Sequence, residues 1–149
     1  MKEITKVVVD AMGGDNAPHE IIKGAVEAVG KSNAIHVILV GKEDVINQEL
    51  SGYTYNKEQI SVVHTSEVIE TAEPPVMAIR RKKDSSIVVG LKMVKDKEAD
   101  AFVSAGSSGA VLAGGQLLVG RIKGVERPPL APLIPTEKGF SILIDCGAN

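Results

Sequence analysis

Short apolar segments alternate along the chain with longer segments in which apolar residues recur at helical spacing. The short segments are rich in valine and isoleucine and show little polar alternation, which is typical of strands buried on both faces. The pattern predicts strands at Val7–Val9, Ile35–Val40, Ile60–Val63, Ala101–Val103 and Ile142–Ile144.

Helices are predicted in the segments between these strands. The first should follow Pro18, which would lie in its first turn, with Asp15 or Asn16 as the capping residue. Its apolar face would consist of Ile21, Ile22, Ala25, Val26 and Val29. Further helices are expected over residues 42–50, 75–83, 84–97 and 107 to about 122.

This alternation predicts an α/β fold, a doubly wound and mostly parallel sheet with helices on both faces. A proline-rich stretch between Arg127 and Phe140 interrupts it, and Pro132 and Pro135 cannot donate ladder hydrogen bonds, so a strand there should be short or lie at an edge. The end of the chain reads as a buried strand and a glycine turn, the usual prelude to another helix. We therefore expect residues 1–149 to form the amino-terminal portion of a single α/β domain.

The composition excludes several classes of protein. The 149 residues are 44% hydrophobic and 24% charged, as in a globular domain, and carry a formal net charge of -2. With no Trp, four Phe or Tyr residues and no basic excess, the chain does not resemble a nucleic-acid binder. One cysteine, Cys146, and the lack of a signal peptide or membrane span in the sequence indicate a cytoplasmic protein.

No metal or cofactor is predicted. The three histidines, His19, His36 and His64, each stand alone without the spacing of metal ligands. The sequence contains neither the GxGxxG pattern of dinucleotide-binding folds nor the Gly-Lys-Ser/Thr triplet of a P-loop after Gly106.

Two glycine-bearing segments follow predicted strands, where open α/β sheets bind ligands. The first glycine loop, Asp10–Pro18, contains Gly13, Gly14 and Asp15 before a helix. Adjacent glycines allow a ligand to approach the backbone, and N–H groups at a helix start favour an anion. The alternative is a tight turn in which Asp15 or Asn16 only caps the helix.

The second glycine loop, Ser104–Ala110, is the stronger candidate for a phosphate or carbonyl-oxygen site. Gly106, Ser107, Ser108 and Gly109 combine two hydroxyls and two glycines with the start of a helix. A structural alternative is a capped turn with Ser107 as the N-cap. A rival functional hypothesis is a nucleophile elbow with Ser108 as acyl-enzyme nucleophile. In α/β-hydrolases the catalytic histidine follows the serine in the sequence, whereas all three histidines of this chain precede Ser108.

Two further segments are weaker candidates. Residues 145–149, with an Asp at the end of a predicted strand, could orient a ligand or a metal, or form a plain turn. The run Arg80–Lys83 could offset a helix dipole at a carboxyl terminus, or it could bind an acidic protein or a phosphate.

Several motifs occur together, in the order DAMGGDNAP, EPPVMAIRRKKDSS, ADAFVSAGSSGA, GRIKGVERPPLAP and DCGAN. This set resembles the bacterial phosphate acyltransferases over the whole chain, although members of that family are about twice as long. The resemblance implies a homodimer that is cytoplasmic or peripheral at the inner face of the membrane. It also implies transfer of a fatty acyl group from acyl carrier protein to inorganic phosphate for phospholipid synthesis, and a fold similar to the isocitrate and isopropylmalate dehydrogenases.

The resemblance also implies roles for individual residues. Phosphate is itself the nucleophile, so the site needs donors that position an anion and stabilise an oxyanion. Ser107, Ser108, Gly106 and Gly109 would supply them, although the family usually carries Asn-Thr where this chain has Ser107-Ser108. Gly13, Gly14 and Asp15 would support this site, and Arg81 and Arg127 would contact phosphate or the carrier. An inactive or binding-only fragment and a serine acyl hydrolase remain as alternatives.

Overall fold

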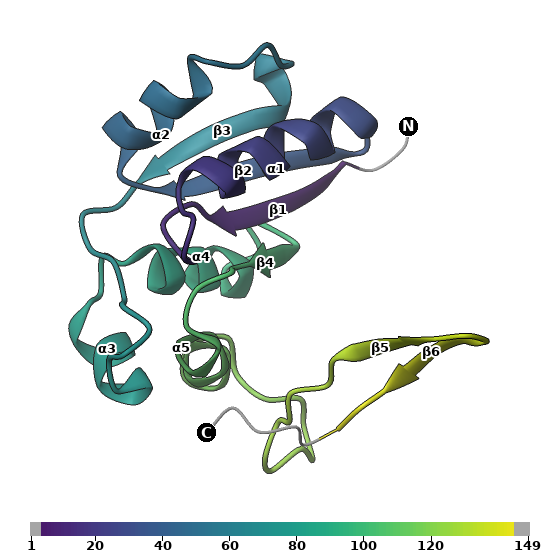
Figure 1. The fold of residues 1–149 in the computed structure, drawn as a ribbon. Helices are drawn as coiled ribbons and strands as arrows, with labels where there is room; N and C mark the ends of the chain where they lie inside the picture. Colours follow the sequence, from purple (N-terminus) through teal and green to yellow (C-terminus); the bar gives the residue numbers. More distant parts are fainter. Residues whose placement is uncertain (1–3, 145–149) are drawn as a thin grey trace.

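A computed structural model describes residues 4–144, and its centre is a parallel sheet of four strands (Figure 1). The strands are β1 (Thr5–Asp10), β2 (Ile35–Gly41), β3 (Ile60–His64) and β4 (Ala101–Val103), and they lie in the order β3-β2-β1-β4. All three pairings are parallel, and Val9 of β1 stands opposite Val103 of β4. The predicted mostly parallel sheet is confirmed, as are four of its five predicted strands.

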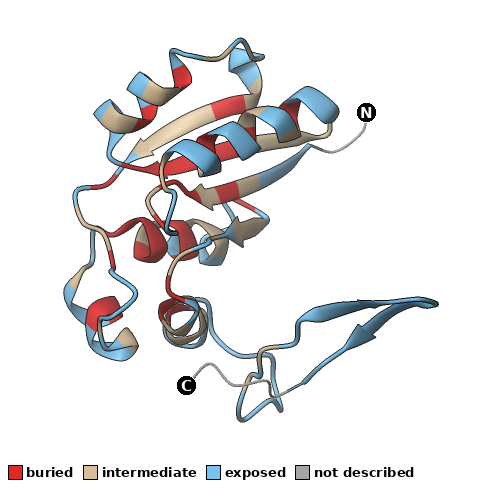
Figure 2. Ribbon diagram, viewed as in Figure 1, coloured by how far each residue is buried: buried red, intermediate tan, exposed pale blue. Residues whose placement is uncertain are grey.

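Helices cover both faces of this sheet. They are α1 (His19–Lys31), α2 (Glu43–Leu50), α3 (Pro75–Arg81), α4 (Ser86–Lys95) and α5 (Ser108–Gly114), with a single 3-10 turn at Lys57–Gln59. α1 and α2 pack on one face and α4 on the other, while α3 and α5 pack beside α4 (Figure 2). This arrangement confirms the prediction of helices on both faces.

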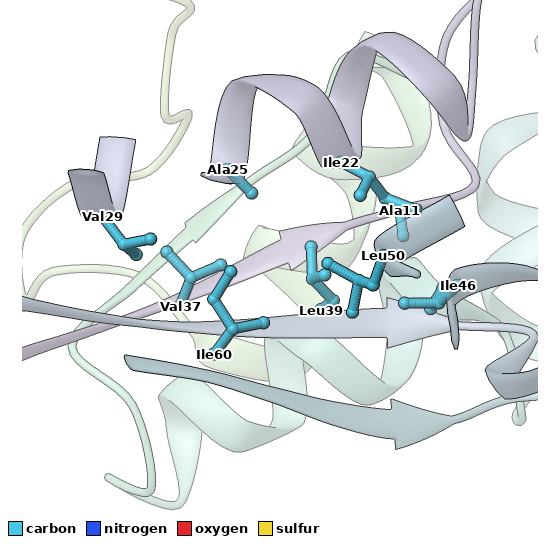
Figure 3. Packing of buried hydrophobic residues seen from close by; sticks show 9 residues of the cluster. All are labelled: Ala11, Ile22, Ala25, Val29, Val37, Leu39, Ile46, Leu50 and Ile60. Atoms are coloured by element: carbon cyan, nitrogen blue, oxygen red, sulfur yellow. The ribbon is translucent and has the colours of Figure 1, made fainter. Parts of the chain in front are cut away.

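Alternation along β2 divides the core between the two faces. Val37 and Leu39 point toward α1 and α2, where they join a buried cluster shown in Figure 3. Ile38 and Val40 point to the opposite face and pack near α4. Both sides of β2 are therefore apolar, which explains its continuous hydrophobic sequence.

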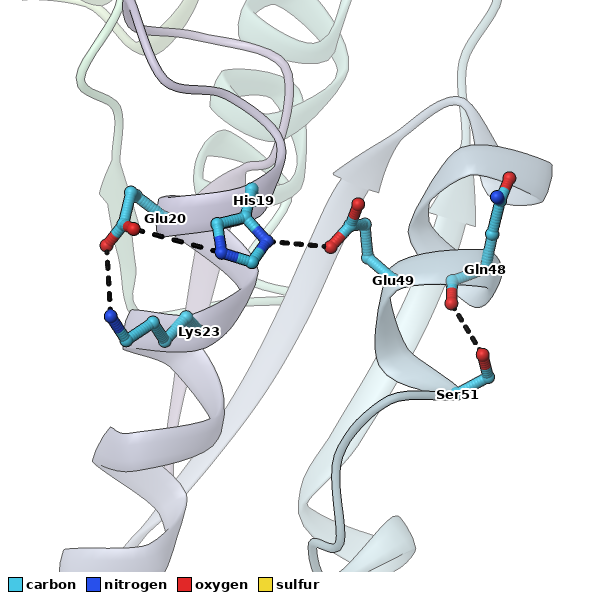
Figure 4. A network of polar contacts seen from close by, with 6 residues as sticks. All are labelled: His19, Glu20, Lys23, Gln48, Glu49 and Ser51. Carbon is cyan, nitrogen blue, oxygen red and sulfur yellow. Dashed lines mark hydrogen bonds and ion pairs between the residues drawn. The ribbon is translucent and has the colours of Figure 1, made fainter.

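A polar contact joins α1 to α2 at the surface. His19, the first residue of α1, forms a 3.0 Å hydrogen bond through Nδ1 with Oε2 of Glu49 in α2 (Figure 4). His19 also lies 3.9 Å from Glu20, whose carboxylate pairs with Lys23. Both ring nitrogens of His19 therefore face carboxylates at the surface of the helices.

Two details of the predicted helices are wrong. α1 begins after Pro18, which is itself the N-cap. No side chain caps the helix, because the N–H groups of Glu20 and Ile22 already donate to the backbone carbonyls of Asn16 and Pro18. The last helix does not run to Ile122: α5 gives way to a π-helical turn at Gly115–Val119, and the chain turns at Gly120 with φ +104.

The predicted buried strand at Ile142–Ile144 is also wrong. β5 (Leu133–Thr136) and β6 (Gly139–Ile142) instead form a separate antiparallel hairpin in which every residue is exposed (Figures 1 and 2). Pro135 lies in β5, so the prediction of a short edge strand in the proline-rich stretch is confirmed. A continuous apolar run indicates an extended strand, but it does not distinguish a buried strand from an exposed one.

Candidate functional site

The two glycine loops meet at one edge of the sheet, beyond the carboxyl ends of β1 and β4. The chain leaves β1 through α1 toward β2 on one side, whereas β4 pairs with the other side of β1. In open α/β sheets the crevice beyond such a topological switch point is the usual place for a ligand. The two glycine loops follow β1 and β4 directly, so the fold brings them together at this edge.

The two glycine loops pack against each other without room for side chains. A Cβ on Gly13 would overlap the Asp10 carboxylate and lie 2.9 Å from the backbone N of Gly106. A Cβ on Gly106 would lie 3.1 Å from Cα of Gly13. Gly14 has φ +111, a conformation that favours glycine, and packs against Ala105. The glycines therefore allow direct contact between the two loops.

A buried carboxylate connects the loops. Asp10, the last residue of β1, is 1% exposed. Its Oδ1 accepts a hydrogen bond from the backbone N of Met12 at 3.1 Å, and its Oδ2 accepts one from Ser104 Oγ at 2.8 Å. Ser104 Oγ in turn accepts a hydrogen bond from the backbone N of Gly106 at 3.0 Å. One chain of hydrogen bonds therefore runs from the first loop to the second.

Sequence reasoning missed Asp10 and Ser104 as site residues. Each is the first residue beyond the apolar core of its strand, and the parallel register of β1 with β4 sets them side by side. A polar residue directly after each of two neighbouring buried strands is the signal that could have found them. Using that signal requires knowing the strand order, which the sequence does not give.

Ser107 and Ser108 have different environments at the start of α5. Ser107 is buried and caps the helix, since its Oγ accepts a hydrogen bond from the backbone N of Ala110 at 3.2 Å. The structural alternative for Ser107 as an N-cap is therefore confirmed. Ser108 is exposed and begins the helix. The first N–H groups of a helix lack partners within it, so Ser108 and Gly109 present N–H groups beside an exposed hydroxyl.

The remaining predicted residues are exposed or lie outside what the structure describes. Asp15 is exposed in the first loop, Arg81 is exposed at the end of α3, and Arg127 is exposed in the segment before β5. Among residues 4–144, none of the three side chains forms a hydrogen bond or ion pair with the second loop. Residues 145–149, the third candidate loop, lie outside the described residues.

The basic run is not uniformly available to a ligand. Lys82 Nζ donates a hydrogen bond to the Val68 carbonyl at 2.6 Å and pairs with the carboxylate of Glu73 at 2.5 Å. The hydrogen bond from Lys82 lowers the pKa of Glu73 below its usual value. Arg80, Arg81 and Lys83 remain exposed. Lys82 therefore holds the loop before α3, while its three neighbours form a cationic surface.

A second Ser–Asp pair lies outside the glycine loops. Ser66, just after β3, donates hydrogen bonds through its backbone N and its Oγ to Oδ2 of Asp84, at 2.8 and 2.5 Å. These hydrogen bonds lower the pKa of Asp84, with the hydroxyl contributing most. This pair resembles the Asp10–Ser104 pair in chemistry but ties together the segments on either side of α3.

The histidines and carboxylates of the described residues do not gather into a metal site. Within residues 4–144, no group of three or more His, Cys, Asp or Glu side chains is arranged to hold a metal ion. His36 bonds to Glu58 and Ser61, and His64 accepts a hydrogen bond from the backbone N of Glu43. None of the helices in the described part of the chain combines the length and apolar character needed to span a bilayer.

Comparison with known proteins gives the family. A family model described as "Fatty acid synthesis protein" matches residues 5–149. The chain belongs to this fatty acid synthesis protein family. It is 60% identical over 144 residues to a protein of Alkaliphilus oremlandii and 58% identical to one of Clostridium novyi, both named phosphate acyltransferase. In each case the match covers 97% of this chain and 43% of the relative, so the chain spans less than half their length.

Solved structures share the fold of this family member. A phosphotransacetylase from Streptococcus pyogenes superimposes with a TM-score of 0.67 and 14% identity, and EutD phosphotransacetylase from Staphylococcus aureus with 0.62 and 19%. The matches cover 97% and 98% of this chain and 47% of each of those chains. At these identities the likeness concerns the fold alone. It supports the α/β architecture, while the expected similarity to isocitrate and isopropylmalate dehydrogenases stays a prediction.

Proposed function

We propose that the two glycine loops bind inorganic phosphate in an acyltransferase that moves a fatty acyl group from acyl carrier protein to phosphate. The product is an acyl phosphate for phospholipid synthesis. The observation that carries the proposal is the meeting of the loops at the switch point, with the exposed Ser108 and the first N–H groups of α5. The relatives named phosphate acyltransferase support the reaction class.

The proposed reaction needs binding groups more than a protein nucleophile. A phosphate oxygen attacks the carbonyl carbon of the thioester, a C–O bond forms, and the C–S bond breaks. The carrier's thiolate leaves and takes up a proton from solvent. Because the phosphate is already anionic near neutral pH, the protein's work is to hold it beside the carbonyl and to stabilise the developing oxyanion.

The hydrogen bonds within the second glycine loop indicate which of its groups are left to contact a ligand. Gly106 already donates its N–H to Ser104, and the Ser107 hydroxyl already caps α5. We therefore assign oxyanion or phosphate contacts to the Ser108 hydroxyl and to the N–H groups of Ser108 and Gly109. Ser107 and Gly106 act through their backbone, and Gly13 and Gly14 allow the loops to approach each other.

Partners and location follow from the resemblance and are part of the proposal. The carrier would be acyl carrier protein, bound by the cationic surface of Arg80, Arg81 and Lys83, and Arg127 would contact phosphate or the carrier. The working protein would be a homodimer that is cytoplasmic or peripheral at the inner face of the membrane. Asp15 would support the anion site from the first loop, where it is exposed.

Replacing the Ser108 hydroxyl tests the proposal. In a protein of the relatives' length that contains these residues, Ser108→Ala should lower acyl-phosphate turnover by about 10²–10³, the usual cost of one well-placed oxyanion donor. Turnover should not vanish, because backbone donors remain. The measurement is acyl phosphate formed from acyl carrier protein thioester and inorganic phosphate, trapped as the hydroxamate. Ser51→Ala, an exposed serine at the end of α2, is the matched control.

Three results would contradict the proposal. Unchanged turnover in Ser108→Ala would remove the hydroxyl from the site. A covalent acyl adduct on Ser108, detected by mass spectrometry of the intact protein, would instead support a serine acyl hydrolase. Binding of phosphate without any acyl transfer would favour a binding-only protein.

A further inference from the structure

Asp10 is a buried carboxylate that the proposed reaction does not use. It is 1% exposed, and within the described residues it forms no ion pair with Lys or Arg. A charge in such a position is costly unless hydrogen bonds compensate it. Both of its oxygens do accept hydrogen bonds, from Met12 N and from Ser104 Oγ.

The carboxylate fixes the direction of the next hydrogen bond. A carboxylate only accepts, so the hydroxyl proton of Ser104 must point toward Asp10. The lone pairs of Ser104 Oγ then face the other way, toward the backbone N–H of Gly106, which donates to them at 3.0 Å. As the acceptor of the Ser104 hydroxyl, Asp10 thus orients the Gly106 peptide through Ser104.

The neighbouring glycines pack closely around this arrangement. Gly13 lies directly over Oδ2 of Asp10, where a Cβ would overlap the oxygen. A Cβ on Gly106 would be 3.3 Å from Ser104 Oγ and 3.5 Å from the same Asp10 oxygen. The carboxylate, the hydroxyl and the two backbones are therefore packed as one unit directly before Ser107 and Ser108.

We propose that Asp10 is a positioning residue for phosphate, acting through Ser104 to set the backbone of the second glycine loop. The inference rests on the proposed phosphate site and adds the residue that orients it. Asp10 does not touch phosphate, because it is buried and because a carboxylate, like the phosphate anion, accepts hydrogen bonds and does not donate them. Its contribution is to hold the N–H groups that follow Gly106 at the position where the anion binds.

The test is a titration of the chain with inorganic phosphate, followed by the amide NMR signals of Ser107, Ser108 and Gly109. Asp10→Asn keeps the shape of the side chain but must place an amide N–H against Met12 N or Ser104 Oγ. We expect it to weaken phosphate binding by about fivefold to tenfold, the equivalent of roughly one hydrogen bond. Ser104→Ala should weaken binding to a similar extent, and Ser104→Thr, which keeps the hydroxyl, should restore it.

The double variant separates positioning from a general loss of stability. If Asp10 acts through Ser104, then Asp10→Asn combined with Ser104→Ala should bind phosphate no more weakly than either single variant. Asp84→Asn and Ser66→Ala disrupt the second Ser–Asp pair and are matched controls that should leave phosphate binding unchanged. Melting curves for every variant show whether the fold is retained, and Ser104→Ala keeps the test valid if Asp10→Asn does not fold.

The outcomes distinguish this inference from the function on which it rests. Phosphate-induced shifts that persist undiminished in Asp10→Asn or in Ser104→Ala would overturn the inference and leave the phosphate site intact. Additive losses in the double variant would overturn it as well, since they would mean independent roles. A lack of shifts in the unaltered chain, up to 100-fold excess of phosphate, would overturn the phosphate site and the inference together.

Discussion

Gly90 shows at the residue scale how a missing side chain sets the distance between a helix and the sheet. It lies within α4, and a Cβ there would be 2.5 Å from the Phe102 ring and 3.0 Å from Val8 Cγ1. Gly90→Ala should therefore destabilise the protein by about 1–3 kcal/mol, because the added methyl overpacks the α4 face. Urea unfolding followed by circular dichroism measures the difference.

Gly24 is the matched control for that prediction. It also lies within a helix, α1, but a Cβ there would meet no atom within 4 Å. Gly24→Ala should raise the free energy of unfolding by up to about 1 kcal/mol, the difference in helix propensity between the two residues. Equal effects of the two substitutions would contradict the packing explanation for Gly90.

The sequence predicted where the candidate site residues lie better than it predicted the contacts that each of them makes. Gly13, Gly106, Ser107 and Ser108 all lie at the predicted edge. Their tasks depend on contacts between segments more than ninety positions apart, such as Ser104 with Asp10. Local sequence patterns indicate that a loop needs a glycine. Only the strand order shows which neighbouring backbone packs against that glycine.

At the scale of elements, the cores of the strands and the first helices were predictable because their periodicity is strong. β2 is apolar on both faces, and α1 keeps Ile22, Ala25 and Val29 on its buried side. The end of α5 and the hairpin were not predictable from the same rules. Ile142 is as apolar as the core strands, yet it is 61% exposed. Whether a strand is buried depends on the elements that pack against it. The periodicity of the strand's own sequence carries no information about those elements.

The surface of α3 allows a functional prediction at this scale. Arg80 and Arg81 are exposed in its last turn, near the exposed Val76 and Met77. In a protein of the relatives' length that contains these residues, reversing both arginines to glutamate should raise the KM for acyl carrier protein about tenfold at low salt, and less at high salt, because the proposed contact would be electrostatic. Lys82 is left unchanged, since its bonds to Glu73 and Val68 hold the adjoining loop.

The controls for this prediction use other helices. Lys31→Glu and Lys95→Glu reverse exposed charges in the last turns of α1 and α4. They therefore remove the same favourable interaction between a cation and the helix dipole as the arginine reversals do. Neither should change the KM for the carrier protein. If these variants raise the KM as much as the arginine reversals do, the effect comes from net charge and α3 is not the docking surface.

At the scale of the whole molecule, buried contacts are distributed unevenly. The three core clusters of the described residues draw on the sheet and on the helices from α1 to α5. Their last buried member along the chain is Ala110, and the partly buried Leu118 packs against the same cluster. The hairpin of β5 and β6 follows, with Leu133, Phe140 and Ile142 each more than half exposed. Isolated two-stranded hairpins are at best marginally stable in water. The sheet and the hairpin should therefore differ in local stability.

Amide hydrogen exchange on the intact chain would measure that difference. Amides in the centre of β2, such as Ile38 and Leu39, should open only with global unfolding, which requires at least about 5 kcal/mol. Those of Ile134 and Ser141 in the hairpin should open with less than about 1 kcal/mol, so they should be protected about a thousandfold less. Amides of the short strand β4 should lie between, because it pairs on one side with β1 and is only partly buried. Hairpin protection equal to that of β2 would show that β5 and β6 unfold together with the sheet, contrary to the separation seen in the structure.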